Sequence, residues 1–256
     1  VIIIGAGLTR AAAQYAPKKR LPPLDRDYFE IAKAVAPGLH DLLQAELDDF
    51  VGDYSSVLCE SLETASTYLY LKALDAKKGD RHHEAFLAHL ELLNQVLAET
   101  TNHIGAGRRS LIYRFFLSEI QRLERPEHLS VLTFNYDILV ERVLDAMNSA
   151  RRGMFVFPGC YRLRGMAPGR VGTFTGAEEF NSSDVNPAGI GVLKLHGSLN
   201  WQSSHTSSSP TPSALTNQNR NLNVLDAKNL PLSLSRRAGR KTLYMKPITV
   251  PPVSGK

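Results

Sequence analysis

The chain opens on Val1-Ile2-Ile3-Ile4-Gly5-Ala6-Gly7, a run of β-branched residues that leads into two closely spaced glycines. Such a run predicts a buried strand, and the following residues, Leu8–Tyr15, are compatible with a helix. Because glycine lacks a Cβ, the junction predicts a tight strand-to-helix turn whose backbone N–H groups can hold a phosphate. A purely structural turn explains the two glycines almost as well.

Two later stretches repeat the pattern of a short apolar strand that ends in polar residues. Val131–Phe134 leads into Asn135-Tyr136-Asp137 and a helix over 138–149, and Gly191–Leu195 leads into His196-Gly197-Ser198. Strands that alternate with helices predict right-handed parallel crossovers and hence an α/β sheet. Ligands bind beyond the carboxyl ends of such strands, near the point where the strand order reverses. We therefore expect the three polar clusters to meet at one rim of the sheet.

Residues 27–124 are expected to form a large helical insertion. Two helical stripes support this expectation, and they consist of Phe86, Leu90, Leu93 and Leu97, and of Ile112, Phe116, Ile120 and Leu123. The sheet-containing core is assigned to residues 1–26 and 125–256, with helices on both faces of a parallel sheet. Within that core, 242–250 predicts a final strand, and the Ser-, Thr-, Asn- and Pro-rich stretch 202–221 predicts a mobile surface loop.

Composition and charge exclude several classes of protein. Of the 256 residues, 43% are hydrophobic and 21% are charged, which rules out wholesale disorder. No apolar run approaches the roughly 18 residues that a membrane span needs, and the opening residues do not resemble a secretory leader. Two cysteines, Cys59 and Cys160, are too few for a disulfide scaffold or a four-cysteine zinc site. We expect a reducing, cytoplasmic location, and both ends read as cut from a longer protein.

The net charge of +5 raises the question of nucleic-acid binding. Basic pairs such as Arg108-Arg109 and Arg236-Arg237 are scattered and lack interleaved aromatic residues, which favours a solvated surface over direct nucleic-acid binding. A dehydrogenase-type dinucleotide fingerprint is also disfavoured. Arg10 stands where its third glycine belongs, and no strand carries Asp25 or Asp27 to the ribose.

The polar residues of the second and third clusters have structural explanations as well as functional ones. Asp137 could cap the helix that follows it, and Asn135 could bond to loop backbone. His196 is the only histidine at the end of a predicted strand. A histidine with a pKa near ~6.5 exchanges protons at neutral pH, but a lone histidine is as often structural.

Taken together, the clusters resemble the sirtuin family, in the form found in sirtuin-like domains of bacterial antiphage defence systems. The matching segments are Gly5–Thr9, Pro22–Phe29, Thr133–Asp137, Lys194–Trp201 and Pro251-Pro252 with Lys256. The resemblance implies a Rossmann-like fold that binds NAD at the strand ends and cleaves the bond between nicotinamide and ribose. Asn135 would hold the attacking water or the ribose hydroxyls, and His196 would be the acid–base partner at the ribose.

The resemblance also implies a set of NAD-binding residues. They are Gly5, Ala6, Gly7, Thr9, Asp137, Gly197 and Ser198. Gly5, Ala6, Gly7 and Thr9 would cradle the pyrophosphate, and Asp137 would orient the nicotinamide–ribose end. Loss of nicotinamide gives an oxocarbenium-like ribose, which needs an electron-rich oxygen nearby, and the Asn135 amide oxygen can supply it.

Deacylating sirtuins carry a zinc ribbon on four cysteines, and this chain has no such set. We therefore expect an NAD glycohydrolase (an NAD⁺ nucleosidase) that uses NAD as its substrate, needs no metal and acts as an antiphage effector by depleting NAD. An NAD-dependent protein deacylase and a non-catalytic module that binds NAD or ADP-ribose are the alternatives. The resemblance further implies a homo-oligomer, or a complex with a sensor protein, as the active assembly.

Overall fold

The computed structural model describes residues 1–13, 21–77, 79–101, 104–105, 108–123, 125, 128–148, 154–155, 159–161, 173–175, 189–205, 221–224, 235–238 and 241–249. The described elements are, in chain order, β1 (Ile2–Ile4), α1 (Ala6–Ala12), η2 (Asp25–Asp27), α2 (Tyr28–Val35), α3 (Pro37–Val51), η3 (Gly52–Tyr54), α4 (Ser55–Leu58), α5 (Leu62–Asp75), α6 (Arg81–Thr101), α7 (Leu111–Gln121), β2 (Ser130–Thr133), α8 (Leu139–Asn148), η5 (Gly159–Tyr161), β3 (Thr173–Thr175), β4 (Gly191–Lys194), β5 (Gly197–His205), β6 (Asn221–Val224), β7 (Ser235–Ala238) and β8 (Lys241–Thr249). The predicted α/β class is confirmed.

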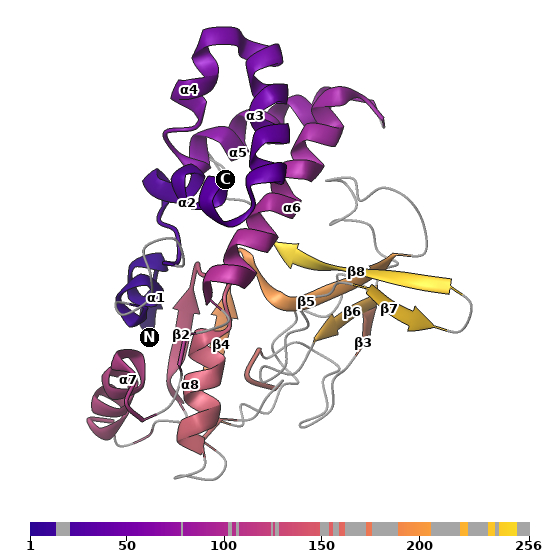
Figure 1. Cartoon of the computed structure of the whole chain (residues 1–256). Coiled ribbons are helices and arrows are strands. Elements are labelled where there is room, and N and C mark those ends of the chain that lie inside the picture. Colours follow the sequence, from indigo (N-terminus) through magenta and orange to yellow (C-terminus); the bar gives the residue numbers. More distant parts are fainter. Residues whose placement is uncertain are drawn as a thin grey trace.

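A three-stranded parallel sheet contains the strands that the sequence predicts, in the order β1-β2-β4 (Figure 1). Ile2, Val131 and Val192 stand next to one another in its register. The chain crosses this sheet in one direction, and right-handed crossovers made in one direction place their helices on one face. Among the described parallel strands the order does not reverse, so the expected reversal point is not found in them.

The covered face of the parallel sheet carries the first hydrophobic core. Val131 and Val192 lie in it with Phe116 of α7 and Val143 and Leu144 of α8, and all five side chains are almost fully buried. The stripe predicted for α7 is confirmed at three positions, where Ile112, Phe116 and Ile120 are buried. The prediction is wrong at the fourth position, because Leu123 lies beyond the end of α7 and is 40% exposed.

The opposite face of the parallel sheet is exposed, which differs from the predicted cover of helices on both faces. Side chains alternate along a strand, and the register places Ile3, Leu132 and Leu193 together on this face. Ile3 is 69% exposed, Leu193 is 42% exposed, and Leu195, just past the end of β4, is 50% exposed. No described helix covers these side chains, as expected for a sheet that is wound in one direction.

The helical character of residues 27–124 is confirmed, and its helices divide between two cores. Helices α2, α3, α5 and α6 build a second hydrophobic core, whereas α7 packs with the sheet. The predicted stripe of α6 is buried at Phe86, Leu93 and Leu97 and partly buried at Leu90. Tyr136 and Leu199, which flank the strand ends, also belong to this second core, so the helical region packs directly on the rim.

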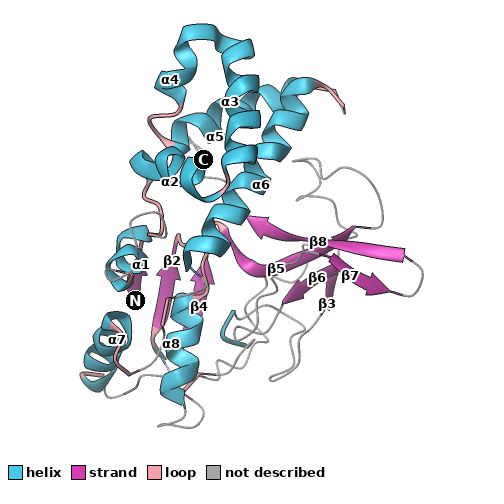
Figure 2. Cartoon of the chain, viewed as in Figure 1, coloured by secondary structure: helices cyan, strands magenta, loops and turns pink. Residues whose placement is uncertain are grey.

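A second sheet is antiparallel, in the order β3-β6-β5-β8-β7 (Figure 2). Strand β8 confirms the strand predicted over 242–250 as far as Thr249, but it pairs antiparallel with β5 and β7. The predicted loop over 202–221 is corrected at both ends, because β5 extends to His205 and β6 begins at Asn221. The remainder of that stretch lies outside the described residues, as do the Pro251-Pro252 segment and Lys256.

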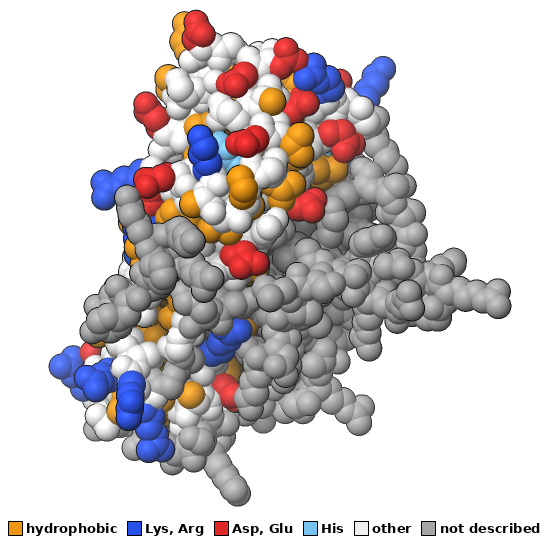
Figure 3. Space-filling model, in the orientation of Figure 1, with side chains coloured by type: hydrophobic (Ala, Val, Ile, Leu, Met, Phe, Trp, Pro, Cys, Tyr) orange, Lys and Arg blue, Asp and Glu red, His pale blue; other side chains and the backbone are white. Residues whose placement is uncertain are grey.

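Charge is unevenly distributed over the face seen in Figure 3. Basic side chains gather over α7, at the lower left, and acidic ones are spread over the helical region above. The exposed arginines on and beside α7 are Arg108, Arg109, Arg114 and Arg122. No helix within the described ranges combines the length and the apolar composition that a bilayer span requires.

Candidate functional site

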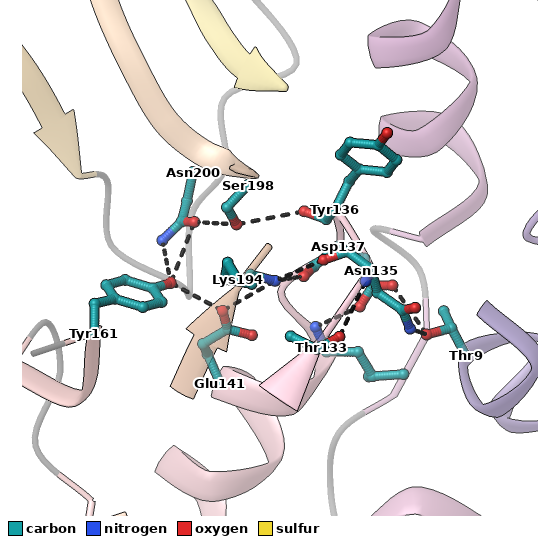
Figure 4. Close-up of polar contacts among 11 residues, drawn as sticks. Thr9, Thr133, Asn135, Tyr136, Asp137, Glu141, Tyr161, Lys194, Ser198 and Asn200 are labelled. Carbon is teal, nitrogen blue, oxygen red and sulfur yellow. Dashed lines mark hydrogen bonds and ion pairs between the residues drawn. The ribbon is translucent and has the colours of Figure 1, made fainter. Parts of the chain in front are cut away.

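The carboxyl ends of the three parallel strands meet at one rim, as their register requires. The Phe134 N–H donates to the Ile4 carbonyl oxygen at 3.2 Å, and the Leu195 N–H donates to the Thr133 carbonyl oxygen at 3.0 Å. Gly5, the Asn135–Asp137 loop and the turn that carries His196 come directly after the strand ends that these bonds join. Figure 4 shows the Asn135–Asp137 loop at this rim. The three predicted clusters are therefore brought together.

Asn135 lies at the centre of this rim, where its side-chain NH₂ group and its backbone N–H donate three hydrogen bonds. Its Nδ2 donates to the Gly5 carbonyl oxygen at 3.2 Å and to Thr9 Oγ1 at 2.7 Å. Its backbone N–H donates to Thr133 Oγ1 at 3.0 Å. Thr9 in turn donates its hydroxyl proton to Asp137 Oδ2 at 2.9 Å. Gly5 before α1, Thr9 in α1 and Thr133 at the end of β2 thus fix the position of Asn135, which is only 6% exposed.

These bonds also decide which way the Asn135 amide faces. The Gly5 carbonyl oxygen can only accept, and Thr9 gives its only hydroxyl proton to Asp137, so the amide turns its NH₂ group toward both. Its Oδ1 is buried and has no hydrogen-bond donor within the described part of the chain. An unsatisfied buried acceptor costs roughly 1–3 kcal/mol, and a ligand hydroxyl or a water molecule would remove that cost.

Asp137 is engaged by the protein through both carboxylate oxygens. While Oδ2 accepts from Thr9, Oδ1 accepts from the Leu139 N–H at 2.9 Å, at the first residue of α8. The structural explanation of Asp137 as a capping residue is therefore confirmed. The same carboxylate accepts from Thr9, which in turn accepts from Asn135, so Asp137 helps to fix the orientation of the Asn135 side chain.

His196 lies in the turn between β4 and β5, beside the loop that carries Asn135. Its ring centroid is 5.6 Å from that of Phe134 and 5.8 Å from that of Tyr136, the two residues on either side of Asn135. The imidazole is partly exposed, whereas Asn135 is buried. A partly exposed imidazole can pass a proton to solvent, which suits the acid–base role predicted for it.

Gly5, Ala6 and Gly7 are exposed at the start of α1. The predicted tight strand-to-helix turn is confirmed, because only Gly5 separates β1 from α1. Gly5 has φ −118° and ψ 177°, an extended conformation that any residue adopts, so its backbone does not itself require glycine. A Cβ built on Gly5 or Gly7 would meet no atom within 4 Å. The backbone here is therefore left open, as close approach of a ligand would require.

Gly197 and Ser198, both predicted to contact NAD, are buried parts of the turn after β4. Gly197 has φ +79°, in the left-handed region that favours glycine, and this conformation lets the chain leave the parallel sheet and enter β5. The Ser198 hydroxyl donates to Asn200 Oδ1 at 2.6 Å. Both residues therefore help to fix the conformation of the turn that contains His196.

Directly behind the Asn135–Asp137 loop lies a buried ion pair that the sequence analysis missed. Lys194 Nζ is 3.1 Å from Glu141 Oε1, and neither side chain is exposed (Figure 4). Tyr161 donates to the same Glu141 oxygen at 2.9 Å and accepts from Asn200 Nδ2 at 3.0 Å. The one signal in the sequence is the position of a lysine between Leu193 and Leu195 in an otherwise apolar strand.

Burial tunes the titration of the groups around this ion pair. It raises the pKa of the Tyr161 phenol well above its usual value, and the Glu141 carboxylate adds to the effect. The phenol therefore stays protonated and acts as a donor to Glu141. Burial also raises the pKa of the neighbouring Cys160 thiol, so this cysteine is held in its unreactive form.

The described residues hold no group of three or more His, Cys, Asp or Glu side chains that could bind a metal ion. In comparisons with known proteins, no protein-family model and no curated protein matches the chain. A function must therefore be inferred from the rim. The rim carries the Asn135 amide with its buried oxygen, which has no donor among the described residues, the exposed backbone of Gly5–Gly7, and His196.

Proposed function

We propose that this chain is an NAD glycohydrolase, which binds NAD across the strand ends and hydrolyses the bond between nicotinamide and ribose. The observation that carries the proposal is the buried Asn135 Oδ1, which faces away from its protein partners and has no donor among the described residues. A ribose hydroxyl or an attacking water supplies that donor. In this proposal the parallel sheet is the NAD-binding part of a Rossmann-like fold.

The chemistry needs little from the protein beyond position and electrostatics. The C1′–N bond breaks, its electron pair leaves with neutral nicotinamide, and the ribose passes through an oxocarbenium-like state. The Asn135 amide oxygen holds the water or hydroxyl beside C1′ and stabilises the developing positive charge without itself titrating. The water oxygen bonds to C1′, and His196 accepts the released proton and passes it to solvent.

The open backbone from Gly5 to Gly7 would receive the pyrophosphate in this proposal, since a Cβ at either glycine meets no protein atom. Thr9 and Asp137 hold Asn135 in place, and Gly197 and Ser198 present His196. On the basis of the resemblance, we also propose a cellular role. The protein would be a cytoplasmic antiphage effector that depletes NAD, either as a homo-oligomer or in complex with a sensor protein. NAD is the substrate, and none of these steps uses a metal.

The test is nicotinamide release from NAD by the purified chain, followed by chromatography. Asn135→Ala and His196→Ala should each lower kcat by about 10²–10⁴-fold, the usual loss when a positioned electrostatic or acid–base group is removed. His128→Ala replaces an exposed histidine away from the rim and is the matched control, with unchanged kcat expected. Equal rates for the Asn135 variant and the wild type would contradict the proposal.

The same assay separates the other two functions. A protein deacylase releases nicotinamide only when an acetyl-lysine peptide is added, whereas the hydrolase proposed here releases it from NAD alone. A non-catalytic binding module is stabilised by ADP-ribose, seen as a rise in melting temperature, and shows no turnover with or without peptide.

A further inference from the structure

We infer that the buried Lys194–Glu141 pair positions the Asn135–Asp137 loop for catalysis, so that Lys194 is a positioning residue and Glu141 its counter-ion. The inference rests on the proposed function, because it concerns the group that would meet the ribose. Both side chains are fully buried and would not touch NAD. Their influence on the reaction passes through the backbone of the loop.

Lys194 uses all three of its ammonium protons in one small volume. They go to Glu141 Oε1 at 3.1 Å, to the Asn135 carbonyl oxygen at 3.2 Å and to the Asp137 carbonyl oxygen (Figure 4). The two carbonyl groups lie on either side of Tyr136. One cation therefore holds the loop at both ends of its central residue, and it satisfies two buried backbone acceptors that need donors.

The central residue is fixed independently of the lysine. The Tyr136 carbonyl oxygen accepts from the Leu199 N–H at 2.9 Å, and its ring packs in the core of the helical region. With the backbone held at Asn135, Tyr136 and Asp137, the side chains of Asn135 and Asp137 are directed toward Thr9. This is the geometry that leaves Asn135 Oδ1 available to a ligand.

Stability alone does not explain a buried pair of this kind. Removing two charges from water is expensive, and apolar residues of similar volume often replace such a pair without loss of stability. Glu141 has a further consequence for the proposed reaction. It neutralises an ammonium that lies against the Asn135 backbone, and a bare positive charge there would oppose an oxocarbenium-like transition state.

The experiment replaces the pair by apolar residues of similar size, in the double variant Lys194→Met with Glu141→Leu. We expect a lower melting temperature, because the Asn135 and Asp137 carbonyl oxygens lose the donor that Lys194 supplies, and an ADP-ribose affinity within about threefold. We expect kcat for nicotinamide release to fall about a hundredfold, the loss that follows a small misplacement of a reacting group. Amide hydrogen exchange over residues 134–139 should become faster. The matched control, Arg81→Met with Glu46→Leu, removes an exposed ion pair and should change none of these.

Wild-type kcat and wild-type exchange in the double variant would overturn the inference, because the pair would then be structural only. If the wild-type protein does not release nicotinamide, the proposed function fails, and the exchange measurement alone decides whether the pair holds the loop. Tyr161→Phe is the milder variant should the double variant not fold. It keeps the ring and removes the hydroxyl that donates to Glu141 and accepts from Asn200, and we expect about a fivefold loss of kcat. No loss would count against the inference.

Discussion

The two faces of the parallel sheet differ in a way that reverses the usual distribution of polar and apolar side chains. On strand β4, Lys194 points into the molecule and is fully buried, whereas Leu193 and Leu195 on either side of it are about half exposed. On β1, Ile4 is buried and Ile3 is largely exposed. The hydrophobic effect alone would bury the leucines and expose the lysine. The direction of the crossovers and the hydrogen bonds at the rim must therefore account for the observed arrangement.

The winding of the chain explains the bare apolar face, and the rim explains the buried lysine. Crossovers in one direction place helices on one face, where Val131 and Val192 join the core. At the end of that same face, Lys194 meets loop carbonyl groups that need donors. Substitutions at neighbouring positions of these strands can therefore distinguish side chains that are buried because they stabilise the fold from side chains that are buried because they hold the rim.

Glu141→Ala should have the largest effect on stability. It leaves the Lys194 ammonium buried without its counter-ion, and loss of one partner of a buried pair costs about 3–5 kcal/mol of unfolding free energy. Urea unfolding followed by circular dichroism measures this change. A loss below about 1 kcal/mol would mean that water reaches Lys194 and that the pair is not buried in solution.

His89 is a fully buried polar side chain of α6, in the helical region. Burial lowers the pKa of His89 from 6.5 to about 4, and the imidazole is bonded to Ser66. Because the folded form resists protonation, His89 contributes stability that is complete above pH 6.5 and is lost as the pH falls toward 4. The difference in pKa corresponds to about 3 kcal/mol.

We therefore expect His89→Gln to weaken the dependence of unfolding free energy on pH between 7 and 4. The measurement is urea unfolding of both proteins at pH 7 and pH 4.5. Parallel pH profiles for the variant and the wild type would show that His89 already titrates normally in the folded protein. Nicotinamide release at pH 7 should be unchanged in the variant, because the contacts described for His89 are with Ser66 and Tyr28 in the helical region.

Ile4→Ala and Ile3→Ala compare the two faces directly, at adjacent positions of β1. Ile4 is buried in the first core, and its truncation should cost about 2 kcal/mol, at the low end for such changes because β1 is an edge strand of the described parallel sheet. Ile3 is exposed, and its truncation should change stability by no more than about 0.5 kcal/mol. Equal losses would indicate that another molecule or segment covers the Ile3 face in solution.

Glu46→Ala should have the smallest effect. Its carboxylate accepts from Arg81 at 2.9 Å, but the two side chains are 38% and 60% exposed, and Arg81 keeps a second partner in Asp49. Solvent screens such pairs, so the melting temperature should not change measurably. A clear loss would show that surface pairs contribute to this fold and would weaken the contrast with Lys194–Glu141.

Much of the parallel sheet could be predicted, because its strands are short apolar runs that end in polar clusters. The pattern gave the strands at residues 1–4, 131–134 and 191–195 to within a residue or two, together with their parallel arrangement. It could not give the exposed face, since an all-apolar run does not distinguish its two sides. That distinction depends on the direction of the crossovers, which is a property of the whole chain.

The antiparallel sheet was harder to foresee from local sequence. The segments Asn221–Val224 and Ser235–Ala238 are only four residues long, and neither contains an apolar run. They form strands by pairing, β6 with β5 and β7 with β8. At the site, Asn135 and His196 were predicted from motifs and lie at one rim. The Lys194–Glu141 contact joins residues more than fifty positions apart, and no local pattern could pair them.

The central claim is that Asn135 Oδ1 meets the ribose of a bound NAD, and the most direct measurement follows the side-chain amide of Asn135 itself. In ¹⁵N-labelled protein its NH₂ signals are assigned by their absence from Asn135→Asp, and the protein is titrated with carba-NAD, which cannot be hydrolysed. We predict a saturable shift of the Asn135 signals. Unchanged Asn135 signals at saturating carba-NAD, in protein whose other signals show that it is folded, would contradict it.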